Sequence, residues 1–446
     1  MKTTSNRARG VCTLALTLGL ALPACDILDV NNPNNLTEES IDAVTAASAL
    51  VNGAVAANAR GISTHWLGYL IATDEIVWIG SRDAWGQLDQ GFVSNPANEF
   101  TDAAFPTVAQ ARWLADRAAT TLDGHVAKTP TTALKTDQAR AYLQAGLIYT
   151  IIGETQEDFV ISDKQEAGNA VGAANMKTIL DQAIQKLDKA VTVATEINNT
   201  ELLNRAQAMR ARAKHSRAIW DKIKPTVNTA APLVSSASAS ADANAVIARA
   251  AADWRYQLTF SSSTLSSTMA GEINSRGEQQ FDTTSIVLVN NAAPKTILGV
   301  KLLDPITGAA DARIVAFMQE WKSGTNIGVA GNIYAPLTLT SVKHMRLILA
   351  EAALAGNDMA GFTTHINAVR ALNDMTAYSG QIPALDMLKH ERRAALFVTG
   401  VRLLDMYRFG IRDPLWHATS DVLRKPGTLL PITCIEANAN PNIPDC

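Results

Sequence analysis

The chain has 446 residues, of which 39 are Lys or Arg and 42 are Asp or Glu, and its formal charge is −3. Hydrophobic residues make up 47% of it, which is enough for a sizeable core. This slightly acidic balance gives no broad basic surface, so we expect no nucleic-acid partner. Past the first 24 residues, no apolar run approaches the roughly 20 residues that a membrane-spanning helix needs.

Residues 1–24 have the features of a secretory leader. Three cations and no acid precede an apolar run over 11–22, which is too short to span a bilayer as a helix. The sequence Leu-Pro-Ala-Cys at 22–25 predicts cleavage before Cys25 and lipidation of that cysteine. The alternative is an ordinary leader with a chance cysteine. Removing the leader lowers the formal charge to −6, and 25–40 then forms a polar tether rich in Asn.

Residues 41–224 are predicted to form an N-terminal helical scaffold. Apolar and small residues recur at spacings of three and four over 132–153 and 176–195, and again from Leu202 to Ala213. The short polar segment between the last two stretches predicts an antiparallel helical hairpin. Consecutive hairpins of this length suggest tetratricopeptide-like packing.

The first part of this scaffold has a less regular pattern. Residues 41–60 are rich in Ala and Val, and 62–79 carry a broad apolar face, so both stretches are predicted helices. The Gly, Asn and Pro residues of 81–104 predict a loop excursion.

Residues 225–340 are predicted to be rich in loops and to face a ligand or a partner. They begin with a break of low complexity over 225–245 and contain a short strand candidate at Ser285–Val289. Helical patterning returns in the C-terminal segment, 341–446. The predicted helices are Ser341–Gly356, Phe362–Asn373 and Leu385–Thr399, with no helical pattern from about 424 onward.

Two cysteines remain near the C-terminus after the leader and the lipid candidate are set aside. Cys434 and Cys446 flank a stretch rich in Asn and Pro, and in an exported protein such a pair can close a disulfide. The Cys-x-x-Cys pattern of a redox site is absent from the sequence.

No motif in the sequence predicts catalysis. There is no Gly-x-Ser-x-Gly elbow and no phosphate-binding glycine loop, and His390-Glu391 is followed by two arginines instead of completing a zinc motif. Asp74-Glu75 are adjacent acids for which we expect a solvated or capping role rather than glycosidase chemistry. We therefore predict no enzyme activity, no cofactor and no metal.

Five stretches in order along the chain resemble the SusD/RagB family of bacterial outer-membrane lipoproteins. They are "CDILDVNNPNN", "LDPITGAADARI", "HMRLILAEAALAGND" with "INAVRALND", "KHERRAALFVTGVRLLDMYRFG", and the terminal "LPITCIEANANPN". The chain departs from the family pattern at Thr399, where Glu is frequent, and at Leu403 or Leu404, where Trp is frequent.

This resemblance implies a mostly α fold, SusD-like, in which tetratricopeptide-like helical hairpins support an irregular binding subdomain. It also implies a non-catalytic, lipid-anchored protein of the outer membrane, facing the cell surface. Such a protein captures an oligosaccharide, or less often a peptide, and delivers it to a TonB-dependent, SusC-like transporter. The alternatives are a tethered hydrolase of extracellular polymers and a helical-repeat scaffold that binds no nutrient.

A sugar-binding site needs exposed aromatic rings edged by polar side chains. Two loop regions offer this combination, whereas Trp66 lies in a helical stripe and is expected in the core. The predicted ligand contacts are Trp78, Arg82, Asp83, Trp85, Trp321, Asn326 and Tyr334.

The charged stretch from 388 to 408 is predicted to be structural. Its acids and arginines are expected to face one another where two short helices meet near Gly400. Glu391 is therefore interpreted as a structural partner and not as a catalyst.

Overall fold

The computed structural model describes residues 38–163, 166–290, 296–321 and 332–446. The chain divides into two units, Met1–Ala46 and Ala47–Cys446. Of the first unit, the short helices α2 (Glu38–Ile41) and η1 (Val44–Ala46) are described, while the predicted leader and Cys25 lie outside the described residues. None of the helices in the described parts of the chain is long and apolar enough to span a membrane.

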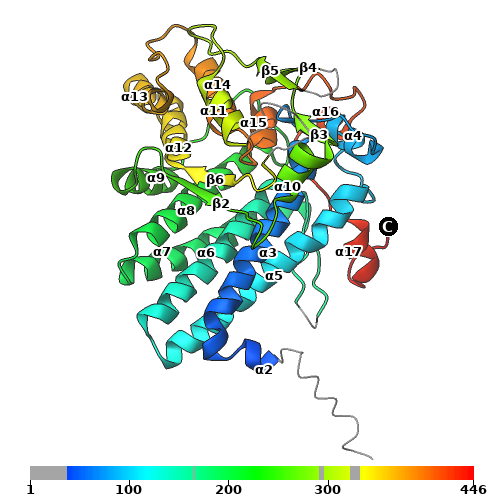
Figure 1. Ribbon diagram of the computed structural model, residues 1–446, viewed down its shortest axis with the longest axis vertical. Helices are drawn as coiled ribbons and strands as arrows, with labels where there is room; N and C mark the ends of the chain where they lie inside the picture. Colours follow the sequence, from blue (N-terminus) through cyan, green and yellow to red (C-terminus); the bar gives the residue numbers. More distant parts are fainter. Residues whose placement is uncertain (1–37, 164–165, 291–295, 322–331) are drawn as a thin grey trace, which may run out of the picture. The chain divides into compact units, whose positions relative to one another are not determined.

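Long helices form the N-terminal part of the second unit, as the apolar spacing predicts (Figure 1). Helix α5 packs against both α3 and α6, and α7 packs against both α6 and α8. Loops of a few residues make α5–α6 and α7–α8 antiparallel hairpins, and the side chains of Thr131 and Asn199 cap α6 and α8. The bounds are α3 Ala47–Leu70, α5 Glu99–Lys128, α6 Thr132–Thr155, α7 Lys177–Glu196 and α8 Thr200–Ile223.

Two predictions in the first part of this scaffold are wrong. Residues Ile76–Trp78 form strand β1 rather than the end of a helix, because β-branched Ile and Val pair with β3 (Gln279–Phe281) far along the chain. The predicted loop 81–104 contains helix α4 (Asp83–Asp89) and the beginning of α5. The side-chain oxygen of Asn98 accepts hydrogen bonds from the backbone N–H groups of Phe100 and Thr101 and so caps the start of α5. The Gly, Asn and Pro content of the segment does not reveal this cap.

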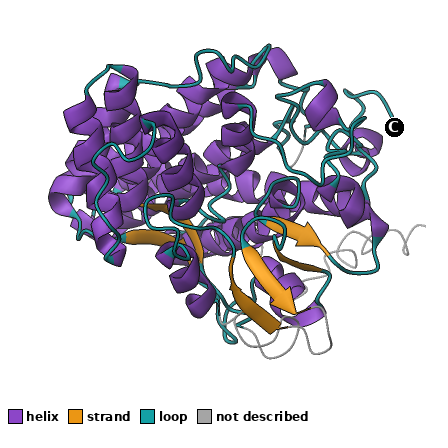
Figure 2. Cartoon of the chain, turned by 90° about the horizontal axis from the view of Figure 1, so that it is seen from above, coloured by secondary structure: helices purple, strands orange, loops and turns teal. Residues whose placement is uncertain are grey.

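The segment 225–340 consists of short helices and strands joined by loops. Figure 2 shows how few strands the protein has beside its helices. The low-complexity break at 225–245 is partly helical, because Ser236 caps α9 (Ala237–Arg249) and its alanines pack on α8 and α12. The strand candidate at Ser285–Val289 is found one to two residues later, as β4. The other elements here are β2 Arg255–Leu258, α10 Thr268–Gly271, η3 Glu272–Arg276, β4 Val287–Asn290, β5 Thr296–Val300, α11 Ala312–Glu320 and β6 Leu337–Ser341, while η2 Ala173–Asn175 lies in the scaffold before α7.

The six described strands form three two-stranded antiparallel sheets, β1–β3, β2–β6 and β4–β5. Two of these sheets join segments that are far apart in the sequence. Strand β1, which follows α3, pairs with β3 and so connects the helical scaffold to the loop-rich segment. Strand β2 pairs with β6, which leads directly into α12 (Val342–Ala355) and so connects this segment to the C-terminal helices.

The C-terminal helices agree with the sequence pattern within a few residues, except near the end. A short helix, α17, begins at Cys434, where no helix is predicted, and Cys434 forms a disulfide with Cys446, their Cα atoms lying 5.4 Å apart. The remaining bounds are α13 Met359–Arg370, η4 Ala371–Asn373, α14 Ala384–Ala395, α15 Arg402–Phe409, α16 Asp421–Arg424 and α17 Cys434–Ala439.

Glycines allow α6 and α7 to approach closely. A Cβ atom added at Gly153 would lie 2.6 Å from Leu180 Cγ, and one added at Gly146 would overlap Leu187. The face of α6 on which apolar residues recur every three or four positions therefore packs against α7. The glycines on this helix matter as much for that packing as its apolar side chains do.

Replacing Gly153 with Ala is expected to lower the free energy of unfolding by about 1–3 kcal/mol, because the added methyl overpacks against Leu180. The matched control is Gly124→Ala on α5, where no atom lies within 4 Å of the new Cβ. That variant should gain about 0.5–1 kcal/mol from helix propensity. Urea unfolding measures both, and a stabilised Gly153→Ala protein would contradict this packing.

Candidate functional site

Three consecutive residues of α14 anchor separate clusters of buried charge. Glu391, Arg392 and Arg393 point in different directions, because successive residues of a helix are turned by about 100°. We call the whole set the arginine–carboxylate network. Its members are Asp74, Asp304, Asp311, Arg313, Glu351, Arg370, Glu391, Arg392, Arg393, Arg402, Asp405 and Arg408.

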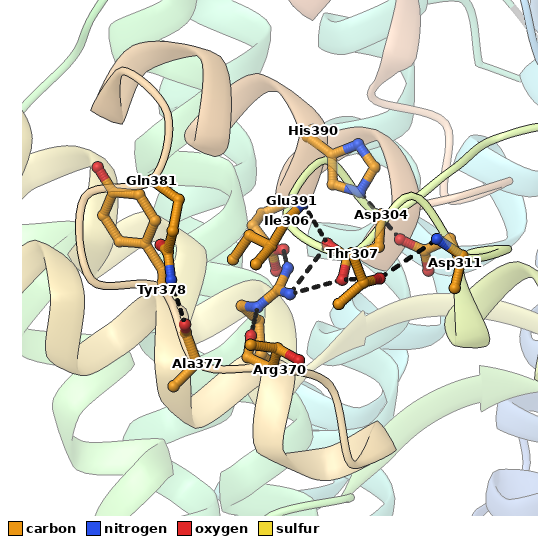
Figure 3. A network of polar contacts seen from close by, with 12 residues as sticks. Asp304, Ile306, Thr307, Asp311, Arg370, Ala377, Tyr378, Gln381, His390 and Glu391 are labelled. Atoms are coloured by element: carbon orange, nitrogen blue, oxygen red, sulfur yellow. Dashed lines mark hydrogen bonds and ion pairs between the residues drawn. The ribbon is translucent and has the colours of Figure 1, made fainter.

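The first cluster surrounds Glu391, which is fully buried (Figure 3). Its carboxylate accepts hydrogen bonds from Arg370 on α13, at 2.9 Å, and from Arg313 on α11. Arg370 also donates to both oxygens of Asp304, at 2.9 and 3.0 Å. One carboxylate thus ties α14 to two other helices.

Asp311 completes this cluster. Burial alone would raise the pKa of Asp311, but hydrogen bonds from Arg313 and from His390 outweigh it and hold that pKa well below its usual range. The distances are 2.7 Å from Arg313 Nη2 and 2.9 Å from His390 Nε2 to Asp311 Oδ2. His390 and Glu391, which begin like a zinc motif in the sequence, are therefore both hydrogen-bonded within this cluster.

The second cluster joins α14 to α12 and α15. Arg392 Nε donates to Asp405 at 2.7 Å, and Arg408 donates to Asp405 and to the buried Glu351. Burial would raise the pKa of Glu351, but the charge of Arg408 and the hydrogen bond from His215 keep it far below its usual value. The sequence-based interpretation of this stretch, with acids and arginines facing across the junction of two short helices, agrees with the structure.

The third cluster corrects the interpretation of Asp74 and Glu75. They lie in a turn between α3 and β1, and both are buried instead of solvated. Asp74 accepts two hydrogen bonds from Arg402, at 2.7 and 2.8 Å, and pairs with Arg393 at 3.0 Å. These acids therefore connect the N-terminal scaffold to α14 and α15.

Glu75 holds the segment between α14 and α15. One of its carboxylate oxygens accepts the Val398 N–H at 3.1 Å, while the other is buried with no hydrogen-bond partner among the residues that the structure describes. Val398 has φ 56°, a left-handed conformation that is costly for a β-branched residue. Gly400 follows with φ 81°, and Trp66, buried as predicted, lies where a Cβ on Gly400 would be.

An aromatic cluster lies beside the arginine–carboxylate network. It consists of Phe281 on β3, Phe317 on α11, Trp321 just after α11, and Phe397, with ring centroids 4.8 to 5.6 Å apart in the contacting pairs. Phe317 and Phe397 meet edge to face, at 4.8 Å. This arrangement is typical of favourable aromatic packing.

Phe317 and Phe397 of this cluster also line a cleft of about 450 Å³. The apolar part of the lining consists of the half-buried Phe317, of Phe397, which is 5% exposed, and of Ala316, Leu372, Ala394 and Ala395. The rest of the lining is polar or charged, a composition that suits a small ligand with both apolar and polar faces. The polar and charged lining residues are Asp253, Arg255, Arg313, Glu320, Thr338, Ser341, Lys343, Asn373 and Thr399. Among the described residues, no group of three or more His, Cys, Asp or Glu side chains could hold a metal ion.

The four predicted contacts at 78–85 lie together but outside the cleft. Trp78 is half-buried and packs on Gly86, while Trp85 is only 4% exposed and stacks on Phe100. Arg82 lies 4.5 Å above the same Phe100 ring, and Asp83 is exposed at the start of α4. Trp78 and the two charged residues remain accessible to a ligand, and the ring of Trp85 does not.

The other three predicted contacts are separated. Trp321 is 1% exposed inside the aromatic cluster, Tyr334 is half-buried, and Asn326 lies outside the described residues. Sequence reasoning missed Phe317, Phe397 and Lys343 as candidate contacts. Phe397 lies in the charged stretch that the sequence analysis interprets as structural. Lys343 follows the cap of α12 and belongs to no motif. Only the fold brings these residues to one cleft.

Together, the helical hairpins, the loop-rich segment and the charged C-terminal helices define a mostly α-helical protein of the SusD-like fold class. The chain is similar to a SusD homolog from Bacteroides thetaiotaomicron, with a TM-score of 0.63 and 13% identity over 91% of this chain and 98% of the other. It is also similar to a SusD superfamily protein from Bacteroides vulgatus, with a TM-score of 0.59 and 13% identity over 88% and 97% of the two chains.

A laminarin-binding SusD-like protein gives a TM-score of 0.55 and 15% identity over 90% of this chain and 98% of the other. No family model matches the sequence, and no curated protein matches it. The expected resemblance to the SusD/RagB family is thus confirmed as a resemblance of fold.

The buried acids make stability depend on pH. Burial raises the pKa of Glu75 from 4.5 to about 8, an effect that the charges of Arg402 and Arg393 only partly oppose. The folded protein therefore keeps this proton where the unfolded chain has lost it, and the free energy of unfolding falls between about pH 4.5 and 8, then levels off. Urea unfolding should show Glu75→Gln losing part of this slope, by at most about 1.4 kcal/mol per pH unit. The exposed Glu196→Gln should keep the wild-type slope, and an identical slope in both variants would contradict the assignment.

Proposed function

We propose that this protein binds oligosaccharides without breaking them, and that the cleft beside Phe317 and Phe397 is a binding site. The observation that carries the proposal is the pairing of two aromatic rings with a surround of hydroxyl, amide and charged groups. Sugar rings present an apolar C–H face and a rim of hydroxyls, which is the complement of such a lining. The likeness of fold to a laminarin-binding SusD-like protein supports the same class of ligand.

The site is rigid on one side because of the arginine–carboxylate network. Arg313 reaches the cleft while paired with Asp311 and Glu391, and Thr399 lies in the segment that Glu75 and Gly400 hold. A wall fixed by buried charge loses little freedom when a ligand binds, which favours affinity.

The accessible residues at the loop that joins β1 to α4 are a second proposed contact. Trp78 at the end of β1, with Arg82 and Asp83, offers a ring edged by charge, although these residues do not line the cleft. Sugar binding at this loop and sugar binding in the cleft are therefore tested with separate variants.

The rest of the proposed role concerns location and delivery. Lipid on Cys25 would tether the protein to the outer membrane with the cleft available at the cell surface, and a TonB-dependent, SusC-like transporter would receive the sugar. Support for this part comes from the leader sequence and from the resemblance of fold.

Isothermal titration calorimetry of the purified protein with a panel of oligosaccharides tests the binding role. Phe317→Ala is expected to weaken binding at least about tenfold, because it removes the more exposed of the two aromatic rings on the lining. Met359→Ala, which removes an exposed apolar side chain outside the cleft, should change nothing. Product analysis should find the sugars intact, and cleavage would favour the tethered hydrolase instead.

Trp78→Ala tests the loop in the same titrations and should also weaken binding, because the half-buried ring would lose its contact with the sugar. An unchanged affinity would remove the loop from the site and leave the cleft in place. If every oligosaccharide failed to bind the wild-type protein, the proposed function would be wrong.

Metabolic labelling with palmitate tests the anchor. The mature protein should incorporate label and fractionate with the outer membrane, and Cys25→Ala should abolish both. Unlabelled wild-type protein in the soluble fraction would contradict lipidation.

A further inference from the structure

One cation on the lining of the cleft has no acidic partner among the described residues. Three cations line the cleft, and two of them are paired: Arg313 with Asp311 and Glu391, and Arg255 with Glu320 at 2.8 Å. The third, Lys343, forms no ion pair with any residue that the structure describes. Its ammonium group donates a hydrogen bond to the side-chain oxygen of Asn373, at 2.8 Å.

The position of Lys343 on its helix is electrostatically unfavourable. It is the second residue of α12, two positions after the cap Ser341, where the positive end of the helix dipole disfavours a cation. Burial lowers the pKa of Lys343, the neighbouring charges of Arg313 and Arg255 lower it further, and those of Asp311 and Glu391 oppose this shift. The protein thus holds an ammonium group at a helix N-terminus in a cleft, with a neutral hydrogen-bond partner and no ion pair among the described residues.

A bound anion would relieve this imbalance, and the lining limits its charge. One unpaired cation matches one negative charge, whereas Asp253 and Glu320 on the same lining would repel a more highly charged group. The volume of about 450 Å³ falls within the range of small-ligand pockets. The Phe317 and Phe397 rings require that the ligand also carry an apolar face.

We propose that the cleft selects a sugar unit carrying one negative charge, with the acidic group on the Lys343 ammonium and the ring against Phe317. This inference rests on the proposed sugar-binding function and specifies its substrate class as acidic oligosaccharide. The acidic group is a uronate carboxylate or a sulfate ester, which share the single charge.

Calorimetry with trigalacturonate and with its methyl ester tests the proposal, because the pair differs in charge and keeps the sugar ring. A sulfated galactose trisaccharide distinguishes the two sources of charge, and a neutral glucan trisaccharide reports on sugar binding in general. We expect at least one acidic probe to bind about tenfold or more tighter than both neutral probes, as a charged hydrogen bond would provide.

Lys343→Gln should remove this preference while leaving the affinity for the neutral probes within about twofold. Lys189→Gln is the matched control, because it removes an exposed lysine of α7 that does not line the cleft, and it should bind as the wild type does.

Asn373→Asp gives a second readout that does not depend on a loss of folding. It places a carboxylate where Lys343 already donates, so it should raise the melting temperature and abolish the preference for acidic probes. If the methyl ester bound as tightly as both acidic probes, or more tightly, the inference would be wrong and sugar binding would stand. The same conclusion would follow if Lys343→Gln kept the wild-type preference for the acidic probes. Failure of all four probes would overturn both the inference and the proposed function for these sugars.

Discussion

The pairing of Glu391 with two arginines is the interaction on which the C-terminal half of the fold depends. A carboxylate that is fully buried is tolerable only if its charge is matched and its oxygens accept hydrogen bonds. Arg370 and Arg313 meet that requirement from two different helices, so neither helix can move without exposing an uncompensated charge. The next two residues of α14 repeat the arrangement toward α12, α15 and the turn after α3. One helix therefore sets the positions of most of the elements around the cleft.

This dependence links the framework to the proposed site. Arg313 belongs to the network and also lines the cleft, and Phe397 and Thr399 lie in the segment that Glu75 and the left-handed Val398 and Gly400 shape. Strained backbone persists only where its surroundings fix it. The cleft is thus a consequence of how buried charge positions α11, α14 and the segment that follows α14.

Much of the fold could be predicted from the sequence, because helices with a clear apolar period report their own packing. The helix over 132–153, the hairpin over 176–213 and the three C-terminal helices are examples. Strand β1 could not be predicted, since its partner lies some two hundred residues away and a short apolar run fits helix and strand alike. The burial of Asp74 and Glu75 could not be predicted for the same reason. It depends on Arg402 and on the Val398 N–H, which only the tertiary fold brings to these acids. The candidate site was the hardest part, because Phe317, Phe397 and Lys343 come from three elements and none stands in a motif.

The most direct test of the account is the free energy of unfolding of Glu391→Ala, measured in urea beside Glu196→Ala. Glu196 forms an exposed pair with Lys135, and its loss should cost no more than about 0.5 kcal/mol. Loss of Glu391 leaves two buried arginines short of a partner and should cost about 3–5 kcal/mol. If both variants unfolded at the same urea concentration, buried charge would not be what holds these helices around the cleft.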